Sequence, residues 1–225
     1  MCGRYTLSAT PARINVQFSV AADPELKPRY NIAPGTEVLM VLDADSGRKA
    51  EPAFWGFTPA WFKPGSRAPR PINARSEGAA EKPMFKHALA RRRCILPADG
   101  FYEWQKREQG KLPWLIRQSD GGVFGFAGIY ESGNEVTEGR PSCAILTTGA
   151  NTLMQPIHQR MPVILRPEDY DAWLAPDTHS TDVQNLLCPY PADDFIAHPV
   201  STRVNSTQRR RIAGQTTAHR LINGQ

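Results

Sequence analysis

Apolar residues in this chain occur in short runs, and most runs are followed closely by turn-forming residues. Glu37–Leu42 and Ser142–Thr148 are two examples, and each has the length of a single strand. Between such runs the chain is rich in residues that interrupt regular structure, with 20 prolines and 17 glycines among its 225 residues. Short strands, mixed with a few helical stretches and without strict alternation, predict one α+β domain over 1–225 with a mostly antiparallel or mixed sheet.

Several stretches have the features of short helices. Thr10-Pro11 places an N-cap residue before a proline, which predicts a helix over roughly 11–19. A second helix is expected near 83–91. It would end at Arg91-Arg92-Arg93, whose positive charges suit the carbonyl end of a helix. We interpret this arginine triplet as a solvated helix end.

Two turns are expected to join neighbouring strands as hairpins, one at 98–100 and one at 119–122. The flanking strands are Cys94–Pro97 with Phe101–Trp104, and Pro113–Arg117 with Val123–Tyr130. Residues 23–35 hold three prolines and a glycine and are predicted to be irregular. Residues 58–71 are predicted to form a long loop, and loops of that length are usually functional or mobile.

Charge and cysteine content narrow the class of protein. The net charge of +5 and pI near 9.2 are compatible with a polyanionic partner but do not require one. No apolar run approaches the ~20 residues that span a bilayer, and the first residues do not resemble a secretion signal. The four cysteines stand far apart, so neither a zinc site nor a disulfide framework is expected. We expect a cytoplasmic, monomeric protein without metal or cofactor, associated with the nucleoid if it is bacterial.

Cys2 offers chemistry that no internal residue can perform. Removal of Met1 is the default expectation before a residue as small as cysteine, and it leaves Cys2 with an α-amine and a thiol on adjacent carbons. Such a 1,2-aminothiol condenses with an aldehyde through nitrogen and then closes a five-membered thiazolidine ring through sulfur. Taken alone the pattern is weak, because Cys2 can also be an ordinary early residue.

Three polar residues in apolar surroundings are candidates for catalysis. Glu103 lies between two aromatic residues in an expected strand; burial there would suit it for general acid catalysis, although the pattern fits an outward-facing residue equally well. His158 could move protons near neutral pH, but a lone histidine is more often structural. Asn73 could orient a substrate, although a hydrogen bond within its own turn is the stronger expectation.

Five further residues are candidates for contacts with nucleic acid. Arg4, Arg75 and Arg160 are candidate phosphate ligands, each in an apolar or loop context. Trp61 and Phe62 look exposed in the 58–71 loop and could stack on unpaired bases, or could pin the loop to the core.

Seven motifs follow one another along the chain, and together they resemble the SOS response-associated peptidase family, the SRAP domain. The motifs are Met1-Cys-Gly-Arg-Tyr5, Tyr30-Asn-Ile-Ala-Pro-Gly35, Phe54-Trp-Gly-Phe57, Ile72-Asn-Ala-Arg-Ser-Glu77, Ala98-Asp-Gly-Phe-Tyr-Glu-Trp104, Ile157-His-Gln-Arg-Met-Pro162, and His198-Pro-Val-Ser201 with Val204-Asn205. They span roughly residues 2–205, which makes chance similarity implausible. The polar tail 206–225 is expected to be loosely held.

The resemblance implies a sheet curled into a barrel-like core with a few short flanking helices. It also implies a protein that binds abasic sites in single-stranded DNA and crosslinks to them, with Cys2 as the nucleophile. Asn73, Glu103 and His158 match active-site positions in this family. Glu103 would assist opening of the abasic sugar, the amine would form an imine at C1′, and the thiol would close the ring. Strand cleavage by β-elimination would be a minor lyase outcome, and the crosslink would be reversible in principle.

The same resemblance assigns the contacts with DNA. The matching residues are Arg4, Arg75 and Arg160 for backbone phosphates, Trp61 and Phe62 for stacking against bases, and Pro34 and Gly35 in the turn beside the site. Some family members carry a second Trp where this chain has Phe62, which puts the strength of that base contact in doubt.

Two other functions fit parts of the sequence. One is a cysteine peptidase or autoproteolytic N-terminal-nucleophile hydrolase that uses Cys2 with His158 as its base. The other is a binding module for single-stranded DNA in which Cys2 has no role. A hydrolase would not need arginines and aromatic residues near its nucleophile, so the crosslinking protein ranks first. Partners at the replication fork cannot be named from the sequence.

Overall fold

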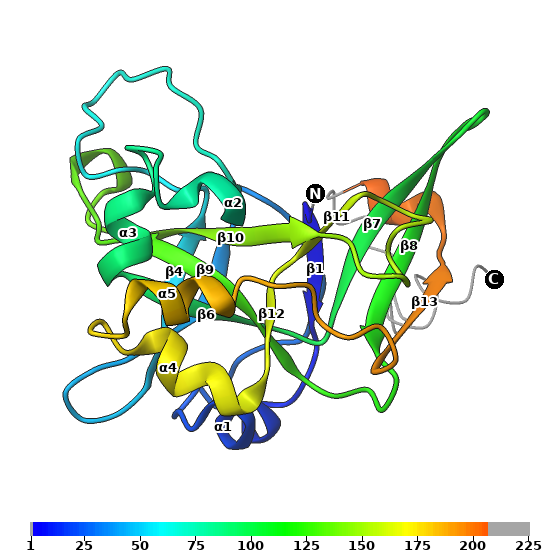
Figure 1. The fold of residues 1–225 in the computed structure, drawn as a ribbon, viewed down its shortest axis with the longest axis horizontal. Helices are drawn as coiled ribbons and strands as arrows, with labels where there is room; N and C mark the ends of the chain where they lie inside the picture. Colours follow the sequence, from blue (N-terminus) through cyan, green and yellow to red (C-terminus); the bar gives the residue numbers. More distant parts are fainter. Residues whose placement is uncertain (1, 207–225) are drawn as a thin grey trace.

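The computed structural model describes residues 2–206, which form two β-sheets (Figure 1). The eight strands of the larger sheet are β3 (Glu37–Leu42), β4 (Lys49–Trp55), β5 (Asn73–Arg75), β6 (Arg93–Ala98), β9 (Phe124–Glu131), β10 (Ser142–Gly149), β11 (Arg160–Pro162) and β12 (Ile164–Leu165). Strands β4, β3, β6, β9 and β10 pair in that order, and β10 pairs with β4 again through a short parallel contact. The expected barrel-like sheet is therefore present as a near-closed ring of strands.

The smaller sheet lies beside this ring and is antiparallel throughout. Its order is β13 (Phe195–Pro199), β8 (Gly110–Gln118), β7 (Gly100–Arg107), β1 (Arg4–Leu7) and β2 (Arg29–Ile32). Tyr5 on β1 packs edge-on against Trp55 and Phe126 of the ring, with centroid distances of 5.2 and 5.7 Å. These contacts hold β1, and with it the N-terminus, against the interior of the ring.

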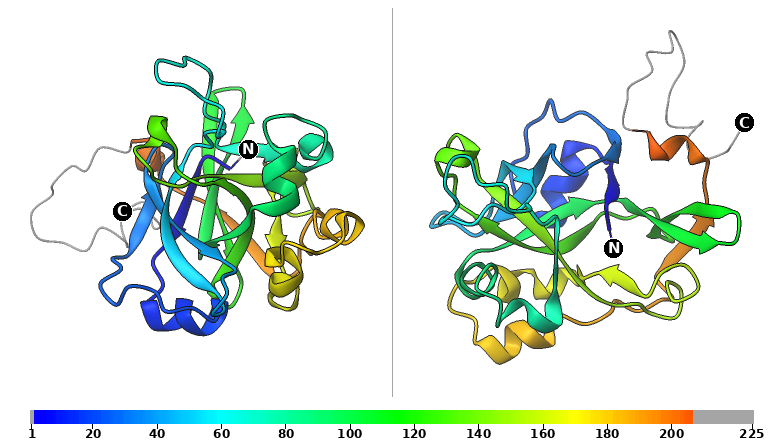
Figure 2. Two further views of the ribbon diagram at one scale, coloured as in Figure 1. Left: turned by 90° about the vertical axis from the view of Figure 1, so that its left-hand side faces the viewer. Right: turned by 90° about the horizontal axis from the view of Figure 1, so that it is seen from above.

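The helices are short and lie around the outside of the sheets (Figure 2). They are α1 (Pro11–Phe18), α2 (Ser76–Ala79), α3 (Lys86–Arg91), α4 (Tyr170–Leu174) and α5 (Ser180–Asn185), with 3-10 turns η1 (Glu135–Thr137), η2 (Pro167–Asp169) and η3 (Thr202–Asn205). Helix α1 confirms the expected N-cap, because Thr10 Oγ1 accepts a hydrogen bond from the Arg13 N–H at 3.4 Å. No helix among residues 2–206 is long and apolar enough to cross a membrane.

The two expected hairpins are wrong. Strand β6 pairs with β3 and β9, whereas β7 pairs with β1 and β8, so the turn at 98–100 carries the chain from one sheet to the other. The turn at 119–122 returns it, from β8 to β9. Asp99 fixes the first crossing, since its carboxylate accepts hydrogen bonds from Thr6 Oγ1 at 2.5 Å and from the Ala9 N–H at 2.9 Å. Strand pairing is decided here by contacts distant in sequence.

Two local expectations also need correction. Residues 29–32 form strand β2 within the segment expected to be irregular, because Pro28 and Pro34 flank this strand and do not interrupt it. The arginine triplet is solvated only in part: Arg91 is exposed as expected, but the expectation is wrong for Arg93. Arg93 is buried and donates to the carbonyls of Leu89 and Ala90, both at 2.8 Å, so its charge does meet the carbonyl end of α3.

The loop at 58–71 is confirmed as a segment without helix or strand, and it projects from the body of the protein (Figures 1 and 2). Met1 and residues 207–225 lie outside the described residues. Two expectations therefore concern residues that the structure does not describe: the loss of Met1, and the loosely held tail over most of 206–225.

Candidate active site and nucleic-acid interface

Strand β1 brings the N-terminus to the junction of the two sheets. Arg4 pairs with Tyr102 of β7 in antiparallel register, which brings the residues before Arg4 toward Glu103, and the Glu103 carboxylate interacts electrostatically with Cys2. Cys2 is completely buried and Glu103 is only 3% exposed. The outward-facing alternative for Glu103 is therefore wrong, and the carboxylate lies beside the N-terminal cysteine.

Asn73 fixes the backbone of Cys2. Its Nδ2 donates a hydrogen bond to the Cys2 carbonyl at 2.9 Å, so the expected hydrogen bond within its own turn is wrong. Strand β5, which carries Asn73, pairs in parallel with β10 and opposes Asn73 to Ile145. The Oδ1 atom of Asn73 is buried and has no hydrogen-bond partner among the residues that the structure describes. The Nδ2 atom of this amide thus binds the Cys2 backbone, whereas the Oδ1 atom can still accept a hydrogen bond.

The environment of Cys2 disfavours the thiolate form of its side chain. Burial raises the pKa of this thiol well above its ordinary value, and the nearby Glu103 carboxylate raises the pKa further. A neutral thiol is a poor nucleophile, so sulfur needs either a base or a strongly electrophilic target.

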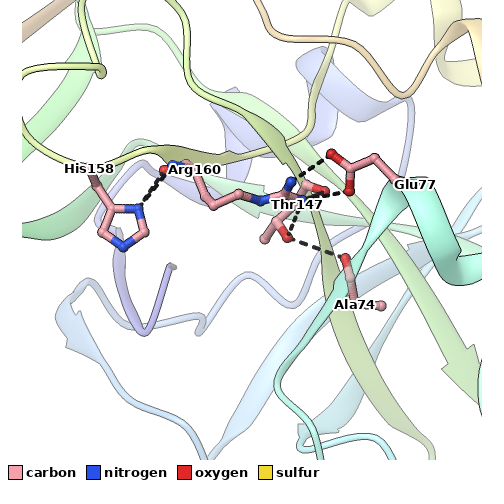
Figure 3. A network of polar contacts seen from close by, with 5 residues as sticks. All are labelled: Ala74, Glu77, Thr147, His158 and Arg160. Atoms are coloured by element: carbon pink, nitrogen blue, oxygen red, sulfur yellow. Dashed lines mark hydrogen bonds and ion pairs between the residues drawn. The ribbon is translucent and has the colours of Figure 1, made fainter.

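His158 lies just before β11 with its ring orientation fixed. Its Nδ1 lies 3.0 Å from the Arg160 N–H, which donates to it, and 3.2 Å from the Arg160 carbonyl oxygen, so the ring is held against the backbone of β11. Gln105 Nε2 donates to the Pro156 carbonyl at 2.9 Å, so the segment that carries His158 is tied to β7 near Glu103. Figure 3 shows the imidazole directed away from the side-chain end of Arg160.

Arg160 reaches across β10 to a carboxylate (Figure 3). Its Nη1 and Nη2 atoms donate to the two carboxylate oxygens of Glu77 at 2.6 and 2.9 Å, and Nη2 also donates to the Thr147 carbonyl at 2.6 Å. The hydrogen bond from Arg160 lowers the pKa of Glu77. This predicted phosphate ligand therefore already holds an anion.

The other two predicted phosphate ligands have different surroundings. Arg4 donates to Asn31 Oδ1 at 3.0 Å and to the carbonyls of Val204 and Asn205 at 2.8 and 3.4 Å, all of them neutral acceptors. Arg75 is exposed, and within residues 2–206 its side chain makes no hydrogen bond or ion pair. Of these three arginines, Arg75 alone presents an unengaged guanidinium to solvent.

The two aromatic residues of the loop differ in burial. Trp61 is 61% exposed, whereas Phe62 is 6% exposed and packs edge-on against the Trp61 ring at 4.8 Å between centroids. The expectation that both are exposed is wrong for Phe62, which packs inward and supports its neighbour. Lys63, Arg67 and Arg70 follow in the same exposed loop, and residues 58–71 contain no acidic side chain.

Pro34 and Gly35 form the turn between β2 and β3. Gly35 has φ of +77°, a left-handed conformation that favours glycine, and its N–H donates to the Trp55 carbonyl at 2.9 Å. It also lines a cavity of about 230 Å³ together with Phe54 and Arg140. Because Ile32, just before this turn, pairs with Tyr5, the turn lies near the end of β1.

Three residues of the site region, Asn31, Glu77 and Asn205, were not predicted from the sequence, although all three belong to the motifs given above. In the structure Asn31 and Asn205 bind Arg4, and Glu77 binds Arg160. Their presence in the same series of motifs as the predicted arginines was the only sign in the sequence that they belong to the site region. Among residues 2–206, no three His, Cys, Asp or Glu side chains gather where they could hold a metal ion.

Comparison with known proteins finds a match along nearly the whole chain. The family described as SOS response associated peptidase (SRAP) matches residues 1–207. The chain is 42% identical over 213 residues to "Abasic site processing protein YoqW" of Bacillus subtilis, covering 92% of this chain and 95% of that protein. It is 33% identical over 218 residues to "Abasic site processing protein YedK" of Escherichia coli, covering 93% and 96%.

Solved structures give the same result for the fold. A protein from Bacteroides thetaiotaomicron is 26% identical and has a TM-score of 0.81, covering 89% of this chain and 93% of that one. A protein from Bordetella bronchiseptica is 29% identical with a TM-score of 0.78, covering 89% and 100%. These similarities confirm the α+β single-domain prediction.

Proposed function

Because this chain belongs to the SOS response-associated peptidase (SRAP) family, we propose that it processes abasic sites in single-stranded DNA by capturing the open sugar on Cys2. The relatives YoqW and YedK, named as abasic site processing proteins, support this substrate. One observation carries the proposal. Cys2 is completely buried beside Glu103 while Asn73 holds its carbonyl, so both nucleophiles of an N-terminal cysteine have a fixed position.

The reaction begins with the amine. An abasic deoxyribose exchanges between a closed hemiacetal and a small fraction of open aldehyde, and Glu103 exchanges the proton at the ring oxygen. An α-amine with an unperturbed pKa of about 7.7–8.0 is partly neutral near pH 7 and attacks C1′. Loss of one water gives the imine. Sulfur does not compete at this step, because the raised pKa keeps the thiol neutral.

The thiol then adds across the imine. A bond forms between Sγ and C1′, the thiol proton leaves to the Glu103 carboxylate, and the former imine nitrogen gains a proton. The product is a thiazolidine, and the net change over both steps is the loss of one water. Closure also removes the imine that would drive β-elimination, so strand cleavage is a minor outcome. Since Glu103 can return the proton, the crosslink is reversible.

Residues at the rim hold the strand. Trp61 offers an exposed face for stacking on an unpaired base, and Arg75 together with the basic 58–71 loop offers phosphate contacts. His158 exchanges protons at the sugar hydroxyl or the adjacent phosphate. A paired strand would cover the base faces that this arrangement needs, so the substrate is single-stranded.

The raised pKa of the thiol argues against the competing peptidase function. Cysteine peptidases attack with a thiolate, and a cysteine with lowered pKa provides it. Cys2 has the opposite environment, with burial and a neighbouring carboxylate both opposing ionisation.

The test uses a single-stranded oligonucleotide with one abasic site, incubated with protein and resolved on a denaturing gel. Wild type should give a covalent band, and Cys2→Ala should give none. Cys188→Ser is the matched control, because Cys188 is a free but exposed cysteine and should crosslink as wild type does. Absence of a band with wild type, or a band that persists in Cys2→Ala, overturns the proposal.

A further inference from the structure

We propose that Glu77 is an internal competitor for DNA phosphate at Arg160, and that it lowers the affinity of the protein for strands without a lesion. This inference rests on the proposed function, which makes Arg160 a phosphate ligand. It adds a residue that sets selectivity between damaged and intact DNA.

Glu77 occupies the part of Arg160 that a phosphate would use. The carboxylate takes one hydrogen bond from each terminal nitrogen of the guanidinium, at 2.6 and 2.9 Å. Phosphate oxygens bind arginine through the same forked pair of donors. The Nε atom is buried and offers no accessible alternative. A bidentate phosphate and the Glu77 carboxylate are therefore mutually exclusive on this fork.

The structure also allows phosphate to replace the Glu77 carboxylate while Arg160 keeps its position. The Glu77 side chain is 58% exposed and the Arg160 side chain 19% exposed, so Glu77 can leave into water while Arg160 stays in place. The Thr147 carbonyl on β10 continues to hold Nη2 at 2.6 Å after such a departure. Parallel pairing of Arg75 with Thr147 places the start of α2, and with it Glu77, directly beside this contact.

Competition acts unequally on the two kinds of strand. An intact strand must displace Glu77 with noncovalent contacts alone, so its occupancy is reduced. A strand with an abasic site is retained by the covalent bond once Cys2 has reacted. The lowered pKa of Glu77 keeps the carboxylate ionised near neutral pH, so the competitor is present under working conditions.

The test measures binding of an intact, fluorescently labelled oligothymidylate by anisotropy at several salt concentrations. Glu77→Gln should bind about twofold to fivefold more tightly than wild type, the range expected for removing a partly exposed ion-pair partner. Its affinity should also depend more steeply on salt: the slope of log K against log salt concentration should be steeper by up to about one. In wild type the departing carboxylate takes up a cation, which offsets the ion released from the phosphate.

Glu81→Gln is the matched control, since Glu81 is an exposed glutamate four positions later, and within residues 2–206 it has no ion pair. It makes the same change in net charge and should alter affinity by less than about twofold. In an Arg160→Gln background, the gain from Glu77→Gln should disappear. Thermal unfolding of each variant checks that the fold is retained.

Three results would overturn the inference. Weaker binding by Glu77→Gln would mean that Glu77 orients Arg160 for DNA. A gain equal to that of Glu81→Gln would mean that only net charge matters, and a gain that survives Arg160→Gln would place the effect elsewhere. The proposed function fails separately, because this assay uses intact DNA and needs no crosslink. A missing covalent band together with tighter binding by Glu77→Gln would remove the chemistry and keep the competitor.

Discussion

The buried end of the site and the exposed 58–71 loop are built on opposite principles. Around Cys2, every proposed catalytic group is held by strand pairing or a hydrogen bond, and Cys2 and Glu103 are buried. In the loop, Trp61 and the basic side chains are exposed, and no strand supports them. Under the proposed function, this difference assigns bond formation and DNA-strand holding to separate parts of the molecule. Variants in the two parts should therefore fail in different assays.

The largest effect is expected at the buried end. Glu103→Gln removes the group that exchanges protons with the sugar and the thiol, so the crosslinking rate should fall about 100-fold or more, the usual contribution of a general acid or base. Reversal should slow as well, while binding to intact single strands should stay within about twofold of wild type. Single-turnover gels and anisotropy measure the two quantities. A variant that crosslinks at the wild-type rate would show that this carboxylate is not the proton carrier.

Within the loop, the buried Phe62 and the exposed Trp61 should have different roles, one in stability and the other in DNA binding. Phe62→Ala should lower the free energy of unfolding by about 3 kcal/mol, because it empties a buried aromatic site. Trp61→Ala should leave unfolding unchanged and weaken binding of single-stranded DNA about tenfold, since stacking contributes ~1–3 kcal/mol per base. Urea denaturation and anisotropy separate the effects. Equal losses of stability in both variants would refute the assignment of Trp61 to DNA.

The buried thiol should also be visible in the dependence of stability on pH. In the unfolded chain the Cys2 thiol ionises near pH 8.5, but in the folded protein its pKa is raised, so it stays protonated. Above about pH 8.5 the unfolded state loses a proton that the folded state keeps, and the free energy of unfolding falls with rising pH. Below that pH this contribution is fully present. Cys2→Ala should make the decline shallower by up to about 1.4 kcal/mol per pH unit, measured by urea denaturation between pH 7 and 10.

The smallest effect is expected from a single basic residue of the loop. Arg70→Gln should weaken binding about twofold at moderate salt and reduce the logarithmic salt slope by about 0.7, the value for one phosphate contact on a single strand. Lys111→Gln, near the tip of the β7–β8 hairpin, makes the same charge change outside the loop. If both variants weaken binding equally, the loop has no special part in holding the strand.

The buried end was also the easier part to predict from sequence, though not for reasons of local pattern. Glu103 between two aromatic residues fitted a buried and an exposed position equally, and only its motif context favoured the active site. Pairing of β1 with β7 decides the matter in the structure, and that contact joins residues almost a hundred positions apart. The wrong hairpins at 98–100 and 119–122 have the same cause, because a turn signal does not tell which sheet receives the next strand.

Side-chain partners were the least predictable feature. The sequence predicted Arg4 and Arg160 as phosphate ligands, but it could not show that neutral oxygens hold Arg4 whereas a carboxylate holds Arg160. Phe62 was misjudged because a long loop rich in proline offers no periodicity from which burial can be read. Helices such as α1 and single strands such as β3 were predictable, since capping residues and apolar runs act locally.

Burial of Cys2 has a consequence for the order of events during synthesis. Its contacts come from Asn73 and Glu103, so the pocket cannot close until about a hundred further residues have left the ribosome. At ~5–20 residues per second, the start of the chain stays accessible for about 5 to 20 seconds. The proposed function requires the loss of Met1, and during that interval Met1 is accessible to an aminopeptidase because Cys2 still belongs to an unfolded nascent chain.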